Sequence, residues 1–241
     1  MLIKTKGIVL KAIKYGETSL IVDIYTEGKG LRKYIVSGVR KQKAKISAGL
    51  LQVMSAVEII AYEKEGKGLN RLKEIRASHI YQSIPMDIRK GAVGLFIAEI
   101  AQKTLKEAES NEPLFGFLSN TFLHLDVEKE SVVKLPIFFL IHLSNFLGFM
   151  PENTYSVDNL YFDLQNGVFC KENVGHNYFM GESSSALFSA FLQSDFDTYQ
   201  EINIDAKQRR VLLFKLLDYY RLHIDNFPVI NSHLILQEVL G

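Results

Sequence analysis

The chain has 241 residues, of which 47% are hydrophobic and 23% charged, enough to bury one large core or two ordinary ones. A single cysteine excludes an internal disulfide, and no signal-peptide core or membrane-spanning apolar run is visible, so we expect a cytoplasmic protein with no membrane contact. The formal net charge of +1 hides a strong asymmetry. Residues 1–80 carry 16 Lys and Arg against 7 Asp and Glu, whereas residues 81–241 carry 12 against 20. This division indicates a polyanionic partner such as nucleic acid at one end of the chain.

The N-terminal part reads as strands separated by glycine turns. Strand-like alternation covers residues 7–15, 19–25, 31–39, 50–62 and 69–81, with little helical periodicity between them. Five short strands are typical of a small closed barrel, and a five-stranded barrel with one basic face is the design of an OB-fold. We therefore predict an OB-fold DNA-binding domain over residues 1–82.

A basic run without acidic residues lies between Lys29 and Lys45. Most short lysine-rich runs are solvated loops, but this one belongs to a strongly basic half of the chain, which favours phosphate contacts. Tyr34 is a candidate for base stacking, although a tyrosine at strand spacing more often packs in a core. The predicted DNA-binding residues are Lys29, Arg32, Lys33, Arg40, Lys41, Lys43 and Lys45, with Arg71, Lys73 and Arg76 as lesser candidates.

From residue 85 onward the apolar spacing becomes helical, which predicts an all-α domain over residues 83–241 and an α+β protein of two domains. Residues 156–182 interrupt the helices as a small β-rich insertion that turns at Asn166–Gly167. Helices are expected from about residue 85 to 109, from an Asn111 cap, from a Ser131 cap to Gly148, from an Asp205–Gln208 capping box, and from Ser232.

No constellation of catalytic residues emerges from the sequence. No phosphate-binding glycine loop of the Walker type and no dinucleotide fingerprint occur. Cys170 and His176 are two ligands where a zinc site usually needs four. Glu17 and Asp23 form a conceivable nuclease pair, but charge balancing within the basic half explains them more simply. We predict a protein that is not an enzyme, with no catalytic residue, no cofactor and no metal.

The succession of motifs resembles the RecO family of bacterial recombination mediators. The stretch GIVLKAIKYGETSLIVDIYTEGKGLRKYIVSGVRK, from Gly7 to Lys41, is similar to the opening of that family, and LIHLSNFLGFMP, from Leu140 to Pro151, is similar to its leucine-rich helix. Shorter matches are Leu50-Leu51-Gln52, Glu99, Glu112-Pro113-Leu114-Phe115 and Ser232-His233.

The chain departs from the family at one place. Many members have four cysteines in the insertion, forming a zinc finger, and this chain keeps only Cys170 there. The resemblance therefore implies a zinc-free remnant of a zinc finger, held by aromatic residues instead of a metal. These residues are Tyr161, Phe162, Phe169 and Phe179.

The resemblance also implies a function. Members of the family bind single- and double-stranded DNA, anneal complementary strands, and bind the acidic C-terminal tail of single-stranded-DNA-binding protein. With RecR they help to load RecA onto coated DNA, so RecA is an indirect partner and the protein would associate with the nucleoid during repair. Annealing requires a basic surface that holds phosphates and makes few base contacts, so that the bases stay free to pair.

A second basic cluster lies on the long C-terminal helix, within the acidic domain. It could receive an acidic peptide that ends in a hydrophobic residue, or it could be only a solvated helix face. Arg209 and Arg210 point about 100° apart on a helix, so we expect one of them to dominate. The cluster consists of Lys207, Arg209, Arg210, Lys215 and Arg221.

Two other function classes stay open. An OB-fold RNA-binding or ribosome-associated module without a recombination role would share the basic barrel, although it has no reason to carry the helical domain. A nuclease using Glu17 and Asp23 is the third alternative.

Overall fold

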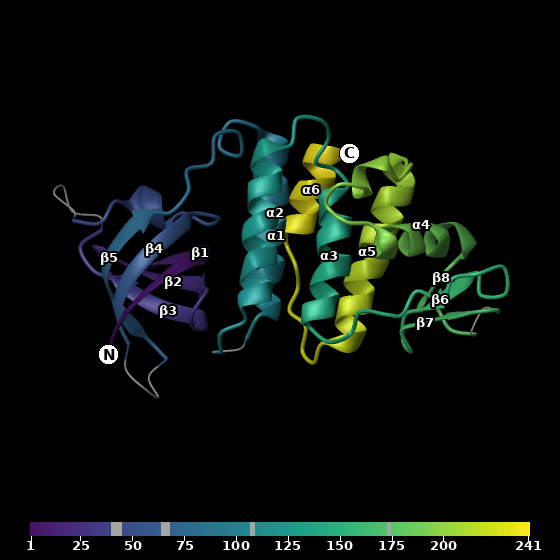
Figure 1. The fold of residues 1–241 in the computed structure, drawn as a ribbon, viewed down its shortest axis with the longest axis horizontal. Coiled ribbons are helices and arrows are strands. Elements are labelled where there is room, and N and C mark those ends of the chain that lie inside the picture. Colours follow the sequence, from purple (N-terminus) through teal and green to yellow (C-terminus); the bar gives the residue numbers. More distant parts are fainter. Residues whose placement is uncertain (40–44, 64–67, 107–108, 173–174) are drawn as a thin grey trace. The chain divides into compact units, whose positions relative to one another are not determined.

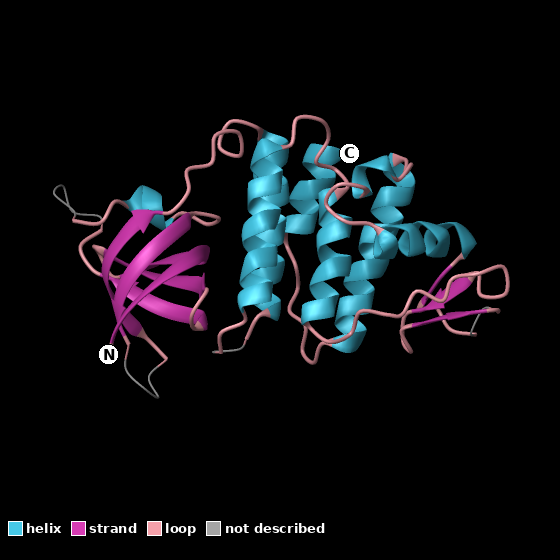
Figure 2. Cartoon of the chain, in the orientation of Figure 1, coloured by secondary structure: helices cyan, strands magenta, loops and turns pink. Residues whose placement is uncertain are grey.

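The computed structural model describes residues 1–39, 45–63, 68–106, 109–172 and 175–241 (Figures 1 and 2). The chain forms two compact units, Met1–Val127 and Glu128–Gly241, called here the barrel unit and the helical unit. The first two helices of the chain thus group with the barrel.

Five strands close into a barrel in the order β1-β2-β3-β5-β4. All neighbouring pairs are antiparallel except β3 and β5, and this arrangement confirms the predicted OB-fold. The prediction of one strand over residues 50–62 was wrong in its first half, where a 3₁₀ turn, Ala48–Leu51, precedes the strand. The strands are β1 (Leu2–Tyr15), β2 (Ser19–Thr26), β3 (Gly30–Val36), β4 (Ala56–Tyr62) and β5 (Asn70–Ala77).

The barrel interior is filled by aliphatic side chains from every strand, including Val9, Val22, Val57 and Leu72. Tyr34 is fully buried among them and donates its hydroxyl to Glu63 Oε1 at 3.1 Å. A buried tyrosine cannot stack on a base, so the packing alternative is correct for this residue. A bulge in β1 between Val9 and Lys11 shifts the strand's alternation by one residue, which decides which later side chains face outward.

Two helices, α1 (Ile88–Thr104) and α2 (Glu112–Val127), cover part of the outer barrel face. Gln102 of α1 donates to Asp23 Oδ2 of β2 at 3.2 Å, and the Tyr25 ring of β2 stacks on Phe115 of α2 with centroids 6.4 Å apart. The predicted start of α2 is confirmed, because Asn111 Oδ1 accepts the Leu114 N–H at 3.0 Å.

Asp126 ties the segment after β5 to the end of α2. Its carboxylate accepts the backbone N–H groups of Gln82, Ser83 and Ile84 at 2.8 to 3.0 Å. Although burial alone would raise the pKa of Asp126, these donors hold it below its usual value. The carboxylate is therefore a structural acceptor inside the barrel unit.

The helical unit contains α3 (Leu135–Phe146), α4 (Glu182–Gln193), α5 (Ala206–His223) and α6 (Ser232–Leu240). The Asp205–Gln208 capping box of α5 is confirmed by reciprocal bonds of 2.8 and 3.1 Å. The expectation that Ser131 caps α3 was wrong, because that helix begins after Lys134 with a proline in its first turn. Asn231 rather than Ser232 precedes α6, and α4 was not predicted.

A three-stranded sheet in the order β7-β6-β8 forms the insertion of the helical unit. Its strands are β6 (Tyr161–Asp163), β7 (Val168–Cys170) and β8 (Phe179–Met180). The predicted turn between β6 and β7 is confirmed, with Gly167 at a φ of +69° that suits glycine. Phe162 lies at the centre, with ring centroids 4.9 Å from Phe169 and 4.7 Å from Phe188 of α4. The ring centroids of Tyr161 and Phe179 lie 6.5 Å apart.

Candidate nucleic-acid interface

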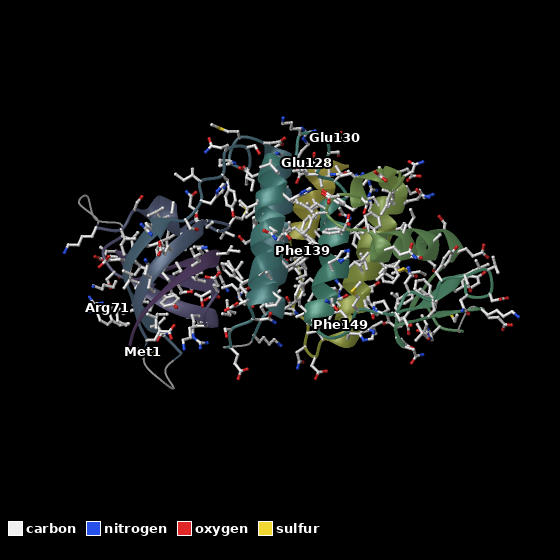
Figure 3. All side chains as sticks on the ribbon, viewed as in Figure 1. Met1, Arg71, Glu128, Glu130, Phe139 and Phe149 are labelled. Atoms are coloured by element: carbon white, nitrogen blue, oxygen red, sulfur yellow. The ribbon has the colours of Figure 1, made fainter. Side chains whose placement is uncertain are left out.

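The outer side chains of β1, β2 and β3 form rows that run across the three strands. The strand registers align Lys11 with Asp23 and Asp23 with Lys33 in one row. They align Ile13 with Ile21 and Ile21 with Ile35 in the next row. Ile35 also pairs with Arg71 of β5, whose exposed side chain projects from the barrel (Figure 3). The face therefore combines exposed cations with a short apolar strip.

The predicted basic run is only partly within the described residues. Arg40, Lys41 and Lys43 lie outside them, so their role stays a prediction. Lys45 is exposed just after that segment, and Lys33 is exposed on the outer face of β3. These two positions are available for phosphate contacts.

Lys29 and Arg32 occupy different places from the rest of the run. Lys29 lies in the turn between β2 and β3, and the whole of β3, about 20 Å long at ~3.3 Å per residue, separates it from the end of the strand at Val36. Arg32 follows the inward alternation of Tyr34, and its Nε lies 3.7 Å from Glu63 Oε1, with 21% of its side chain exposed. The strands thus distribute the run over both ends of the barrel.

Sequence reasoning missed the exposed side chains at the outer end of β1. Lys11 and Lys14 are exposed, as are Ile13 at 47% and Tyr15 at 53%. Their signal in the sequence was the alternation of Lys11, Ile13 and Tyr15, in which two large apolar residues share a face with a lysine. A turn carrying Glu17 follows them and leads into β2.

The lesser candidates on β5 differ in their surroundings. Glu58 of β4 pairs with Arg76 and with Lys4 Nζ, the latter at 2.8 Å, and hydrogen bonds from these two cations lower the pKa of Glu58. Lys73 Nζ lies 3.2 Å from Glu74 Oε1. Arg76 and Lys73 therefore have carboxylate partners beside them, whereas Arg71 adjoins the apolar strip.

Arg209 and Arg210 both line a small pocket between α3, α5 and α6 in the helical unit, with a volume of about 30 Å³. Arg209 Nη2 donates to the carbonyl oxygens of Leu240 at 2.9 Å and of Gly241 at 3.0 Å. Burial and the neighbouring Arg210 lower the pKa of Arg209, whereas Arg210 is exposed. The apolar lining consists of Val133, Pro136, Ile137, Leu213, Leu236 and Leu240.

The other three members of the predicted partner cluster do not line this pocket. Lys215 Nζ lies 3.5 Å from the Asn177 carbonyl and 5.7 Å from the centre of the Phe179 ring. Arg221 Nη1 donates to Asp218 Oδ1 at 2.6 Å, and Lys207 is exposed in the first turn of α5. The structure therefore brings together two of the five residues.

The described residues contain no group of three or more His, Cys, Asp or Glu that could hold a metal ion. Burial raises the pKa of Cys170, which keeps it a thiol at neutral pH. Asp23 is 5% exposed and accepts from Gln102, so it lacks the open position that a nuclease carboxylate needs. Among the helices in the described ranges, none is both long and apolar enough to cross a membrane.

Two family models together match almost the whole chain. "Recombination protein O N terminal" matches residues 1–81 and "Recombination protein O C terminal" matches residues 85–231. Curated relatives named DNA repair protein RecO include those of Christiangramia forsetii, 37% identical over 100% of both chains, and Phocaeicola vulgatus, 31% identical over 100% of both. The protein of that name from Bacteroides fragilis is 33% identical over 99% of both.

Proposed function

Because the chain belongs to the RecO family and so has a role in DNA repair and recombination, we propose that it is a DNA-binding mediator that anneals complementary single strands. In this proposal it acts with RecR to help load RecA onto DNA coated by single-stranded-DNA-binding protein. The supporting observation is the outer face of β1, β2, β3 and β5, where Lys11, Lys33 and Arg71 are all exposed.

The annealing step rests on electrostatics. Two strands repel each other through their phosphates, and a basic surface that binds both lowers this repulsion while releasing counterions. Lysine side chains on a sheet face hold phosphates as point charges and impose no base sequence. The barrel unit would therefore bring strands together and leave most bases available for pairing.

The helical unit would bind the acidic tail of the single-strand binder at the Arg209–Arg210 pocket. Carboxylates of the tail would pair with Arg210. They would also replace the carbonyls of Leu240 and Gly241 as the hydrogen-bond acceptors of Arg209. The hydrophobic end of the tail would pack on the apolar lining provided by Ile137, Leu213 and Leu236. Because the present volume of about 30 Å³ holds little more than a water molecule, the end of α6 has to move for a large side chain to enter.

The experiment is annealing of complementary oligonucleotides, both naked and coated with the cognate single-strand binder. Lys11→Ala with Lys33→Ala should make the logarithmic salt dependence of DNA affinity about 1.4 to 1.8 units shallower and weaken binding about 10- to 30-fold near 0.15 M salt. The matched control replaces two exposed lysines of the helical unit, Lys129 and Lys171, and should leave both quantities unchanged.

Wild-type protein that binds DNA but does not anneal it would contradict the proposal. Tight RNA binding without annealing of coated DNA would instead favour the RNA-binding module. An unchanged salt slope in the Lys11 and Lys33 variant would move the phosphate site away from this face.

A further inference from the structure

We propose that the outer face of the barrel binds the unstacked bases of a single strand on an apolar platform formed by Ile13, Tyr15, Ile21 and Ile35. In this arrangement Lys11, Lys33 and Arg71 hold the adjoining phosphates. The inference rests on the proposed DNA-binding function and adds to it a base-contacting site that distinguishes single strands from duplexes.

The register of the strands builds the platform. Ile13 of β1 lies opposite Ile21 of β2, which lies opposite Ile35 of β3. Tyr15 pairs with Ser19 at the end of β1, two positions beyond Ile13 on the same face. Ile13 is 47% exposed and Tyr15 is 53% exposed, and with the partly exposed Ile21 and Ile35 they form a contiguous apolar patch rather than a single exposed side chain.

The platform begins where the helical cover ends. In the row before it, Ile8 and Tyr25 are buried, and Tyr25 stacks on Phe115 of α2. Asp23 is buried and accepts a hydrogen bond from Gln102 of α1, while its row neighbours Lys11 and Lys33 remain exposed. The two lysines therefore form the boundary between the covered rows and the open apolar row.

The charges around the platform select a polyanion. Lys11 and Lys33 flank it on one side, and Arg71 lies beside Ile35. Of the nearby acids, Asp23 is engaged by Gln102, and Glu17 lies in the turn beyond Tyr15. An aromatic ring and aliphatic side chains edged by cations match nucleobases joined by phosphates, because every base has a flat face that can stack.

The size of the platform selects a single strand and limits the contact to a few bases. Three adjacent strands about 4.8 Å apart span roughly 10 Å, which accommodates two or three bases. Bases in a duplex are stacked on each other and cannot lie flat on a sheet face. A contact with so few bases leaves the rest of the strand free to pair, as annealing requires.

The test compares three probes with full-length protein: a 20-nucleotide oligo-dT, an abasic phosphodiester oligomer of equal length, and a duplex of equal length. Wild type should bind oligo-dT more tightly than the abasic oligomer. Tyr15→Ala should weaken oligo-dT binding about tenfold, the order expected for one stacked base, and leave the other two probes unaffected. Tyr15→Phe should retain wild-type affinity, since it keeps the ring.

The matched control is Tyr178→Ala, which removes a tyrosine of similar exposure, 45%, from the insertion of the helical unit. It should leave all three affinities unchanged. Photocrosslinking of wild-type protein to oligonucleotides containing 5-iododeoxyuridine should map to residues 11–35, which tests the site even if a variant fails to fold.

Three outcomes separate the possibilities. Equal wild-type affinity for oligo-dT and the abasic oligomer would overturn the platform while leaving phosphate binding intact. Equal losses for Tyr15→Ala on those two probes, or crosslinks confined to another face, would also overturn it. Absence of binding to every probe would overturn both the platform and the proposed function.

Discussion

The two units of the chain use their β-sheets in opposite ways. The barrel closes around its own aliphatic interior, so its outer face is available to carry exposed lysines and an apolar strip. The sheet of β6, β7 and β8 encloses no interior and instead packs aromatic rings against α4 and α5, where Phe162 lies 5.7 Å from Tyr219. A closed sheet can offer its outer face to a ligand, whereas a small open sheet has to pack one face against helices in order to be stable.

Both units engage some of their basic side chains and leave others exposed. In the barrel unit, Lys11 and Lys33 extend from a sheet face into solvent, whereas Arg76 pairs with Glu58. On α5, Arg209 binds backbone carbonyls and Arg221 binds Asp218, whereas Arg210 is exposed. A cluster of cations in the sequence therefore does not show how many of them can receive a ligand.

The strongest way to test the comparison is to remove the central ring of the small sheet. Phe162 is fully buried and contacts Phe169, Phe188 and Tyr219. Phe162→Ala should lower the free energy of unfolding of the helical unit by about 3 to 5 kcal/mol, measured by urea denaturation. DNA binding by the barrel unit should persist.

The control for that prediction is Cys170→Ser, which should unfold within about 0.5 kcal/mol of wild type because the half-buried thiol donates to the Glu172 carbonyl at 3.3 Å and a serine hydroxyl can do the same. Metal analysis of the purified protein should find substoichiometric zinc. One tightly bound zinc per chain, together with a mild effect of Phe162→Ala, would show that metal rather than aromatic packing holds the sheet.

Features of the fold that depend on local chemistry could be predicted from the sequence. The Asn166–Gly167 turn, the Asn111 start of α2 and the Asp205–Gln208 capping box each rest on a few neighbouring residues. The start of α3 was misplaced because the prediction relied on Ser131 as a cap, whereas the helix begins at Leu135 with Pro136 in its first turn and without a side-chain cap. No cap signal of comparable strength marks α4, which begins after Gly181 without a side-chain cap.

The candidate site could be predicted only in outline. The basic half of the chain located it in the barrel, but a run along the sequence does not become one surface in a sheet, because successive residues face opposite sides. Arg32 therefore follows Tyr34 inward, while Lys33 faces out. The bulge after Val9 was equally invisible in the sequence, and it determines that Lys11, Ile13 and Tyr15 share the outer face.

A second prediction sharpens the contrast between cations on α5. Arg210→Glu should weaken binding of an acidic, hydrophobic-ended peptide about tenfold, because it places a negative charge, which repels the carboxylates of the peptide, beside the pocket. Arg221→Glu makes the same charge change on the same helix, beside Asp218 and away from the pocket lining, and should have little effect. Peptide titration by calorimetry measures both. Equal effects of the two variants would mean that net charge, and not the pocket, attracts the peptide.

The smallest expected effect concerns pH and distinguishes the cores of the two units. His142 of α3 packs against Phe138 with ring centroids 4.3 Å apart, and its Nε2 has no hydrogen-bond partner among the described residues. Burial lowers its pKa from the ordinary value of 6.5, so the folded helical unit favours the neutral imidazole. The corresponding stability is fully present above the pKa of the unfolded chain and is lost as the pH falls through the lower folded pKa. Wild-type Tm should therefore decline slightly more between pH 7 and 5.5 than that of His142→Leu, which cannot titrate, and parallel curves would contradict this assignment.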